Sequence, residues 1–415
     1  MTALGELSPP GPPADLPVPT LPNYRVTIVA GEPSGDALGG QIMAALNELT
    51  DGRVLYEGAG GDAMKAEGLE PAFPLSDTAV MGLKEVFPKI PLILRRVREV
   101  SDRAAEWQPD AVLLIDAPDF THRIARRLSK RAPEVTVIKY VAPQVWASRP
   151  WRAKSMGEIA DHLLALLPFE VPFFERFGLE TTFVGHPVVE RAKLVRGGSG
   201  LRDRLGLGAE VPMLCLLPGS RSNEVGFLLP VFREVVAQLV ADLPNLECVL
   251  PTVPHVKERV LADTRDWPTP LALVEGTADK FAAFSGATAA LAASGTVSTE
   301  LALARCPTVI TYKVGWFTAA VARQMITVDY VTLVNLLLKR PAIPEFLQDD
   351  CTPEALLPAI RALLTDPEAR RRQVADQRKA LDLLGLGDEA PSRRAAKAVL
   401  YVIHTKRRRN VARLA

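Results

Sequence analysis

The chain has 415 residues, 48% of them hydrophobic, and its 49 basic side chains nearly balance 48 acidic ones, which leaves a formal net charge of +1. The length predicts two or three domains, because single hydrophobic cores seldom grow past about 250–300 residues. The charge balance argues against a nucleic-acid-wrapping protein, which needs a basic surface. The four cysteines are spread through a long chain and lack metal-ligand spacing. They are Cys215, Cys248, Cys306 and Cys351. This pattern argues against a disulfide framework and against a structural zinc site, and it favours a reducing compartment.

Residues 1–22 form a proline-rich head that holds seven of the 35 prolines. The head has neither the basic start nor the apolar run of a secretory signal, so we expect it to be extended and disordered. No uninterrupted stretch of about 18 apolar residues follows it, so no membrane span is expected. The slightly positive mean hydropathy of +0.10 must therefore come from buried sheets or from an apolar surface patch.

From Tyr24 onward, short apolar runs alternate with longer amphipathic stretches. Apolar runs of about 4–8 residues with little alternation are typical of strands covered on both faces, as in parallel sheets. We therefore predict an α/β fold of doubly wound, Rossmann-like parallel sheets built from repeated βα units. The predicted strands are residues 25–30, 54–57, 111–115, 135–141, 162–166, 181–184, 213–217, 246–250, 271–274, 289–292 and 308–312.

A glycine-rich stretch at residues 197–200 precedes a new βα series and marks the expected domain boundary. We predict a first Rossmann-like domain over 23–196 and a second over 201–385. A C-terminal helix and basic tail, 386–415, are expected to pack back on the first domain. In such sheets ligands bind beyond the carboxyl ends of the strands, so functional residues are sought in the loops that follow them.

The first strand runs into AGEPSGD at residues 30–36. A glycine-rich turn between strand and helix lets backbone N–H groups approach an anionic or polyhydroxylated ligand. The spacing matches neither the dinucleotide fingerprint nor the P-loop. An ordinary tight turn with Ser34 or Asp36 as helix cap remains an equal alternative.

The third strand ends in IDAPDF at residues 115–120, where two carboxylates follow a buried strand within four residues. A carboxylate so placed can act as a general base on a hydroxyl, and Asp116 at the strand end is the stronger candidate. The alternative is that Asp116 and Asp119 are loop and helix-capping residues.

Two further strand ends carry aromatic and imidazole groups. Trp146 lies in YVAPQVW at 140–146. A tryptophan at this place suits a sugar or lipid pocket, but it can equally fill the hydrophobic core. His186 lies in FVGHP at 183–187; a lone histidine is more often a structural hydrogen-bonding residue than a catalyst.

Two loops of the second domain suit phosphate. The first, LPGSRSNEV at 217–225, supplies Gly219, Ser220 and Arg221, and the planar fork of an arginine matches diphosphate oxygens. The second opens a helix and supplies Ser294, Gly295 and Thr296, while Glu300 lies one turn on, where it can accept hydrogen bonds from ribose. Simple helix capping is the alternative, yet two such loops in one domain favour a nucleotide site.

Residues 81–100 interleave apolar and basic side chains, which suits a surface element that dips into an anionic membrane interface. Ordinary amphipathic packing is the alternative. The basic run at 406–409 is typical of a solvated tail, although it can add to the same attraction. The predicted membrane contacts are Phe87, Ile90, Leu92, Ile93 and Leu94.

These motifs, together with MGLKEV at 81–86, LPFE at 167–170 and TVDYVTLVNLL at 327–337, resemble the lipid-A-disaccharide synthase family of inverting, GT-B-fold glycosyltransferases. The resemblance extends from about Tyr24 to Leu384. It implies two Rossmann-like domains facing a central cleft. It also implies transfer of diacylglucosamine from a UDP donor to the 6-hydroxyl of diacylglucosamine 1-phosphate, which forms a β(1→6) bond and releases UDP.

The same resemblance assigns roles to residues. Asp116 is implied as the base, with Glu32 as a second catalytic residue, and Arg221 as the diphosphate ligand. Glu300 is implied to bind the ribose. The other implied substrate-binding residues are Ser34, Gly35, Asp119, Trp146, His186, Gly219, Ser220, Ser294, Gly295, Thr296 and Asn335.

The resemblance implies no metal or other cofactor and a location on the cytoplasmic face of the inner membrane. The net charge of +1 argues against a nucleic-acid partner. Members of the family can form dimers, which leaves a homodimer open for this chain. One rival hypothesis is another UDP-sugar enzyme of similar fold, a UDP-N-acetylglucosamine epimerase or a peptidoglycan-type glycosyltransferase. The other is a non-catalytic protein that binds sugar nucleotide or lipid.

Overall fold

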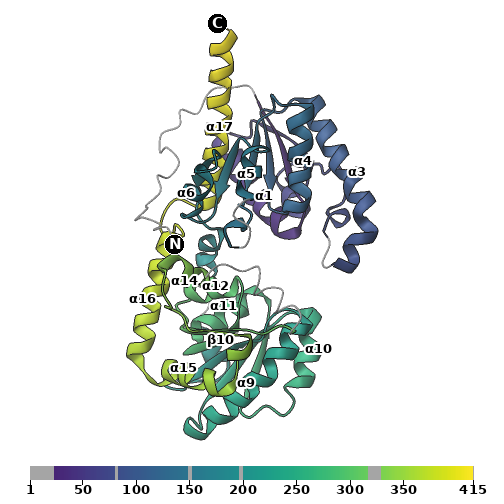
Figure 1. Ribbon diagram of the computed structural model, residues 1–415. Helices are drawn as coiled ribbons and strands as arrows, with labels where there is room; N and C mark the ends of the chain where they lie inside the picture. Colours follow the sequence, from purple (N-terminus) through teal and green to yellow (C-terminus); the bar gives the residue numbers. More distant parts are fainter. Residues whose placement is uncertain (1–22, 80–82, 148–151, 196–199, 316–328, 415) are drawn as a thin grey trace. The chain divides into compact units, whose positions relative to one another are not determined.

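A computed structural model describes residues 23–79, 83–147, 152–195, 200–315 and 329–414. The chain forms two compact units (Figure 1). The first comprises Met1–Pro187 together with Gly387–Ala415, and the second comprises Val188–Leu386. Each unit contains a six-stranded parallel sheet with helices packed against it, so the predicted α/β class is confirmed.

The sheet of the first unit has the strand order β2-β1-β3-β4-β5-β6. Its inner strands are almost wholly buried, as their uninterrupted apolar runs predict. Ala30 at the end of β1 pairs with Ile115 at the end of β3, so the loops that follow these strands start side by side. The strands are β1 Tyr24–Ala30, β2 Val54–Ala59, β3 Ala111–Ile115, β4 Val137–Tyr140, β5 His162–Ala165 and β6 Glu180–Phe183.

Helices cover both faces of this sheet, and in Figure 1 α3 lies beside α4. On the other face α1 packs against α17, which brings the end of the chain back to its beginning. Ile42 and Leu46 of α1 share one core with Ala395 and Val399 of α17. The helices are α1 Pro33–Leu49, α2 Asp62–Ala66, α3 Leu83–Trp107, α4 Pro118–Arg131, α5 Arg152–Gly157, α6 Glu170–Glu175 and α17 Pro391–Leu414.

The sheet of the second unit has the strand order β12-β11-β10-β7-β8-β9. Its strands are β7 Met213–Leu217, β8 Glu247–Thr252, β9 Leu271–Glu275, β10 Ala289–Ala293, β11 Thr308–Tyr312 and β12 Glu345–Leu347. Its helices include α8 Gly200–Arg204, α9 Ser222–Asp242, α10 Pro254–Asp263, α11 Gly276–Gly286, α12 Val297–Leu303, α14 Leu333–Leu338, α15 Pro353–Thr365 and α16 Pro367–Leu383.

All eleven predicted strands are present, with ends that shift by at most two residues. Sequence reasoning missed β12, because this strand has only three residues at the sheet edge and all three are partly exposed. The four cysteines are free and buried. Among the described helices, none is both long enough and apolar enough to cross a membrane.

Candidate functional site

The loops after β1 and β3 touch each other at the carboxyl edge of the first sheet. A methyl group placed on Gly31 would lie 2.8 Å from the Cβ atom of Ala117, so only glycine allows this approach. The contact brings together two motifs whose first residues lie 85 residues apart in sequence, AGEPSGD and IDAPDF.

The approach gathers three carboxyl groups, those of Glu32, Asp116 and Asp119. The pKa of Glu32 is raised, first by burial and then by the negative charges of Asp116 and Asp119. The protonated form of Glu32 is therefore favoured more than it is in water, as expected where carboxylates share a site. Perturbed carboxyl groups of this kind are typical of acid–base sites. Among the described residues, no group of three or more histidines, cysteines or carboxylates is arranged to hold a metal ion.

Asp116 and Ala117 form a left-handed turn between β3 and α4. Their φ angles are 44° and 39°, in a region that residues with a side chain rarely adopt. Each such residue costs on the order of 1–3 kcal/mol, so the turn persists only because its surroundings hold it. At the end of the neighbouring strand β4, Val141 has a φ of 72°, and it is β-branched. Strain is thus concentrated at two adjacent strand ends.

A pocket of about 350 Å³ opens beside these carboxyl groups. Its lining combines apolar side chains of α3 with acidic and basic groups from the two loops and from α4. Such a pocket suits a molecule with a hydrocarbon part and a polar head. Its lining residues are Glu32, Thr78, Ile90, Ile93, Leu94, Ala117, Pro118, Asp119, Phe120 and Arg123.

Three of the five predicted membrane contacts, Ile90, Ile93 and Leu94, therefore line the same pocket as residues of the acidic loop. Ile90 and Leu94 are 40% and 37% exposed. Val97 and Val100 on the same helix are buried in the core, so amphipathic packing accounts for that part of the segment. Leu92 and Ile93 are partly buried, and the side chain of Phe87 lies outside the described residues.

The first loop contains both exposed residues and buried residues with structural contacts. Ser34 is exposed at the start of α1, while Gly35 packs close to Ala30. Asp36 is buried and accepts hydrogen bonds from the backbone N–H groups of Gly61, Ala63 and Met64 at 2.7–3.1 Å. Asp36 therefore caps α2 and not its own helix, whose cap Glu32 makes no side-chain hydrogen bond.

Trp146 is held in place by a buried carboxyl group. Its Nε1 donates to Glu170 at 3.1 Å, and its ring packs edge-on against Phe169 at 4.9 Å between centroids. Burial raises the pKa of Glu170 to about 7, although hydrogen bonds from the N–H groups of residues 166 and 167 oppose the shift. Trp146 remains partly exposed, and His186 after β6 is likewise half-buried.

In the second unit, the loop after β7 is organised by Glu224. Gly219 has a φ of 111°, and a methyl group there would lie 2.5 Å from the Cβ atom of Glu224. The Glu224 carboxylate accepts from the N–H groups of Ser220 and Arg221, and from one Arg221 guanidinium nitrogen at 2.7 Å. The Arg221 side chain is nevertheless 75% exposed, so the rest of its fork faces solvent at the start of α9.

The loop after β10 exposes Gly295 and Thr296, with Ser294 partly buried. One turn into α12, Glu300 is 3% exposed and lies between two cations. Both of its carboxylate oxygens accept from Lys280, at 3.0 and 3.1 Å, and Arg191 donates to one of them. A carboxylate at this depth is stable because it is paired.

Asn335 is fully buried, and its side chain is used within the protein. The amide donates to the carbonyl of Ile343 and to Glu345, both at 2.8 Å, and its oxygen accepts from the Ile343 N–H. Asn335 thus anchors the segment before β12 to α14, and these bonds leave little of the amide for a ligand.

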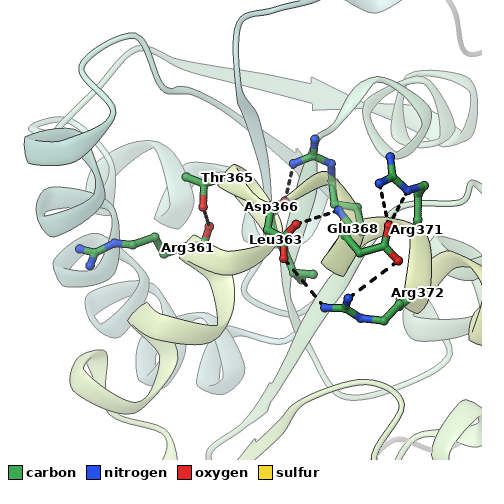
Figure 2. Close-up of polar contacts among 8 residues, drawn as sticks. Arg361, Leu363, Thr365, Asp366, Glu368, Arg371 and Arg372 are labelled. Carbon is green, nitrogen blue, oxygen red and sulfur yellow. Dashed lines mark hydrogen bonds and ion pairs between the residues drawn. The ribbon is translucent and has the colours of Figure 1, made fainter.

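A wider groove of about 830 Å³ lies at the other edge of the second sheet, before β10 and β11. Four arginines line it, but acidic or carbonyl oxygens engage three of them, Arg370, Arg371 and Arg378. Figure 2 shows part of this network, in which Glu368 pairs with Arg371 and Asp366 caps α16. The hydrogen bonds from Arg370 to the carbonyls of Leu363 and Leu364 join α16 to α15. The groove therefore belongs to the scaffold rather than to the ligand edge of the sheet.

Sequence reasoning missed a lysine that lies directly beneath the acidic turn. Lys139 on β4 is 2% exposed; its Nζ donates to the Asp116 carbonyl and, at 3.0 Å, to Thr121 Oγ1. Burial lowers the pKa of Lys139 to about 7, against the opposing effect of the Asp116 charge. The signal available in the sequence was a single charged residue within the apolar run TVIKYV.

Comparison with known proteins identifies the family. Residues 26–399 match the family profile described as Lipid-A-disaccharide synthetase. The chain belongs to this family. The lipid-A-disaccharide synthase of Rhodospirillum centenum is 49% identical over 92% of this chain and 95% of its own length. That of Paramagnetospirillum magneticum is 46% identical over 93% of this chain and 99% of its own.

Solved structures of lower identity share the fold. A UDP-N-acetylglucosamine 2-epimerase from Listeria monocytogenes, described as putative in its source, superposes with a TM-score of 0.59 at 14% identity, covering 85% of this chain and 91% of the other. MurG of Acinetobacter baumannii superposes at 0.54 with 15% identity, covering 93% and 100%. The fold is thus of the GT-B type. Family membership makes the chain a lipid A biosynthesis glycosyltransferase and favours this activity over an epimerase or a non-catalytic binding protein.

Proposed function

We propose that this chain transfers 2,3-diacylglucosamine from its UDP conjugate to the 6-hydroxyl of 2,3-diacylglucosamine 1-phosphate. The observation that carries the proposal is family membership over residues 26–399, which include the acidic loops and both phosphate-suited loops. The acceptor oxygen attacks the anomeric carbon of the donor from the face opposite UDP. The bond to UDP breaks as the β(1→6) bond forms, and UDP leaves with the electron pair.

In this proposal Asp116 removes the proton of the acceptor hydroxyl as the new bond forms. Its support is its place at the end of β3, beside the pocket that Asp119 and Arg123 line. Glu32, whose pKa is raised, is proposed to hydrogen-bond the acceptor sugar beside Asp116. Ser34, Trp146 and the other residues of this edge contribute contacts to the lipid sugar.

The second unit is proposed to bind the UDP part of the donor. Arg221 offers a largely exposed guanidinium group to the diphosphate, fixed at one nitrogen by Glu224. The exposed 294–296 loop supplies further donors, and Glu300 is proposed to accept from the ribose. Arg191 and Lys280 supply three of the about four hydrogen bonds that a carboxylate can accept, which leaves capacity for one from the ribose.

No metal ion or organic cofactor enters the proposed reaction, because cationic side chains and backbone N–H groups can stabilise the leaving diphosphate. Turnover is therefore expected to continue in excess EDTA. A loss of activity that magnesium restores would overturn this part of the proposal.

We also propose that the enzyme works as a peripheral protein on the cytoplasmic face of the inner membrane, because its substrates are lipids. The exposed Ile90 and Leu94 and the neighbouring basic residues support this placement. Association into a homodimer is proposed from the family alone, and sedimentation analysis of the purified protein tests it.

The central test supplies UDP-2,3-diacylglucosamine and 2,3-diacylglucosamine 1-phosphate in detergent micelles and follows UDP release. Asp116→Asn is expected to lower kcat by about 10²–10⁴-fold, the usual contribution of a general base, with little change in UDP affinity. Asp62→Asn is a matched control, because the Asp62 side chain is 98% exposed on α2. Absence of turnover by the wild type would refute the function, and lost UDP affinity in Asp116→Asn would refute the assigned role.

A further inference from the structure

The turn that presents Asp116 is held from below by a compact set of hydrogen bonds. Thr121 Oγ1 donates to the carbonyl oxygens of Asp116 and Ala117, at 2.7 and 3.0 Å. Lys139 Nζ donates to the same Asp116 carbonyl and to Thr121 Oγ1. The N–H of Asp116 in turn donates to the carbonyl of Tyr140 at 3.0 Å. Both peptide groups beside Asp116 are thereby fixed.

These hydrogen bonds stabilise a turn whose backbone conformation is unfavourable by itself. Asp116 and Ala117 are two consecutive residues with side chains in the left-handed region. Extended or right-handed alternatives would carry the Asp116 carboxylate in other directions from the strand end. The two donors from Thr121 and Lys139 converge on the carbonyl that lies between these two residues, so they select the left-handed form.

The position of Lys139 is costly for a purely structural residue. It lies on β4 inside the sheet, is 2% exposed, and pairs in register with the buried residues Leu114 on β3 and Leu163 on β5. A branched apolar residue would fill the site without the cost of burying an amine. The Nε2 atom of the nearby His122 is buried and has no hydrogen-bond partner among the described residues, so it does not accept from the lysine.

We propose that Lys139 and Thr121 are positioning residues, which clamp the strained turn so that the Asp116 carboxylate is aimed at the acceptor hydroxyl. The proposal rests on the proposed function of Asp116 as the base. Neither residue is assigned contact with substrate: Thr121 is fully buried and Lys139 nearly so. Their effect is on the rate of the proton-transfer step, since a misplacement of about 1 Å can cost on the order of 10²-fold.

The test compares three variants in the disaccharide assay. Lys139→Met fills the same space without a donor, and Thr121→Val removes the hydroxyl at nearly constant shape. Both are expected to lower kcat by about 10–100-fold, with KM for the acceptor and UDP affinity within about threefold of the wild type. Thr121→Ser keeps the hydroxyl and is expected to stay within about threefold. Lys65→Met, a change at a 54% exposed lysine, is the matched control.

A second arm tests the strain itself. Ala117→Gly removes the side chain that disfavours the left-handed turn, so it is expected to restore part of the kcat that Lys139→Met loses. All rates are normalised to the folded fraction measured by circular dichroism. The Thr121→Val and Thr121→Ser pair keeps the test decisive if Lys139→Met folds poorly.

The outcomes separate the two proposals. Wild-type kcat in both Lys139→Met and Thr121→Val, alongside an inactive Asp116→Asn, overturns the clamp and leaves the base in place. An equal loss in Thr121→Ser and Thr121→Val also overturns it, because the hydroxyl would then be irrelevant. Full activity of Asp116→Asn refutes the base, and with it the premise on which the clamp rests.

Discussion

The pKa of Lys139 reports how completely water is excluded from the space beneath the Asp116 turn. Burial lowers the pKa of this lysine from 10.5 to about 7 in the folded protein, while the unfolded chain keeps the ordinary value. Between these two pH values the unfolded state therefore binds more protons than the folded state. It follows that the stability of the wild type rises with pH across this window and is lower near pH 7.

The size of the effect follows from one proton. A full difference of one bound proton changes the free energy of unfolding by about 1.4 kcal/mol per pH unit, so the gain from pH 7.5 to 9.5 is about 2–3 kcal/mol. The neighbouring His122 adds nothing in this range, because burial and the charges of Lys139, Arg126 and Arg152 lower its pKa to about 3. The negative charge of Asp116 opposes the lowering of the Lys139 pKa but is outweighed by burial.

The assay is urea unfolding followed by circular dichroism at pH 7.5, 8.5 and 9.5, applied to the wild type and to Lys139→Met. The quantity compared is the difference in unfolding free energy between the two proteins, which cancels the titrations that they share. The variant is expected to lose about 2–3 kcal/mol relative to the wild type over this range. Parallel curves for the two proteins would refute the reasoning, since they would mean that Lys139 stays protonated and hydrated. Lys65→Met, at an exposed site, is expected to follow the wild type.

Three further predictions concern other parts of the first unit. Asp36→Ala is expected to lower the unfolding free energy by about 2–3 kcal/mol in urea titrations, because three backbone N–H groups lose a charged acceptor, whereas Asp36→Asn loses less. The wild type is expected to lose stability as pH rises from 4.5 through about 7, because the pKa of Glu170 is raised in the folded state only. Glu170→Gln is expected to abolish this loss. The double change Ile90→Ser and Leu94→Ser is expected to weaken sedimentation with anionic vesicles about tenfold or more, while Leu55→Ser, at a 51% exposed residue on β2, leaves it unchanged.

The sequence was sufficient to predict the fold class because the inner strands of both sheets are almost wholly buried. A strand covered on both faces needs an uninterrupted apolar run, and that run is visible without any knowledge of the partner strands. Strand β12 was not predicted, because Glu345, Phe346 and Leu347 are partly exposed and three residues are too few to show a periodic pattern of hydrophobicity. The rule that ligands bind after strands also selected Asp116 and Arg221 before their surroundings were known.

The contacts around the site residues could not be predicted from the sequence. Asp36 looked like a cap for its own helix but caps α2, whose first N–H groups lie 25–28 residues further along. Trp146 depends on Glu170, which lies 24 residues away. Such partners are set by strand order and loop path rather than by local spacing. A buried charge in an apolar strand, as at Lys139, is the clearest warning that an unseen partner exists.

The shared pocket links the chemistry of the first unit to its proposed place at a membrane. An acylated acceptor that left the bilayer would expose its hydrocarbon, at a cost of about 0.8 kcal/mol for each methylene group. A pocket of about 350 Å³ covers only part of such a molecule. Ile90 and Leu94 line that pocket and are also exposed. Acyl chains of the acceptor that extend past them can therefore remain in the lipid interface while the sugar reaches Asp119 and its neighbours. Under the proposed function, the apolar side chains of α3 would lower the cost of bringing the acceptor hydroxyl to the strained turn, so the pocket and the turn are expected to act on the same substrate.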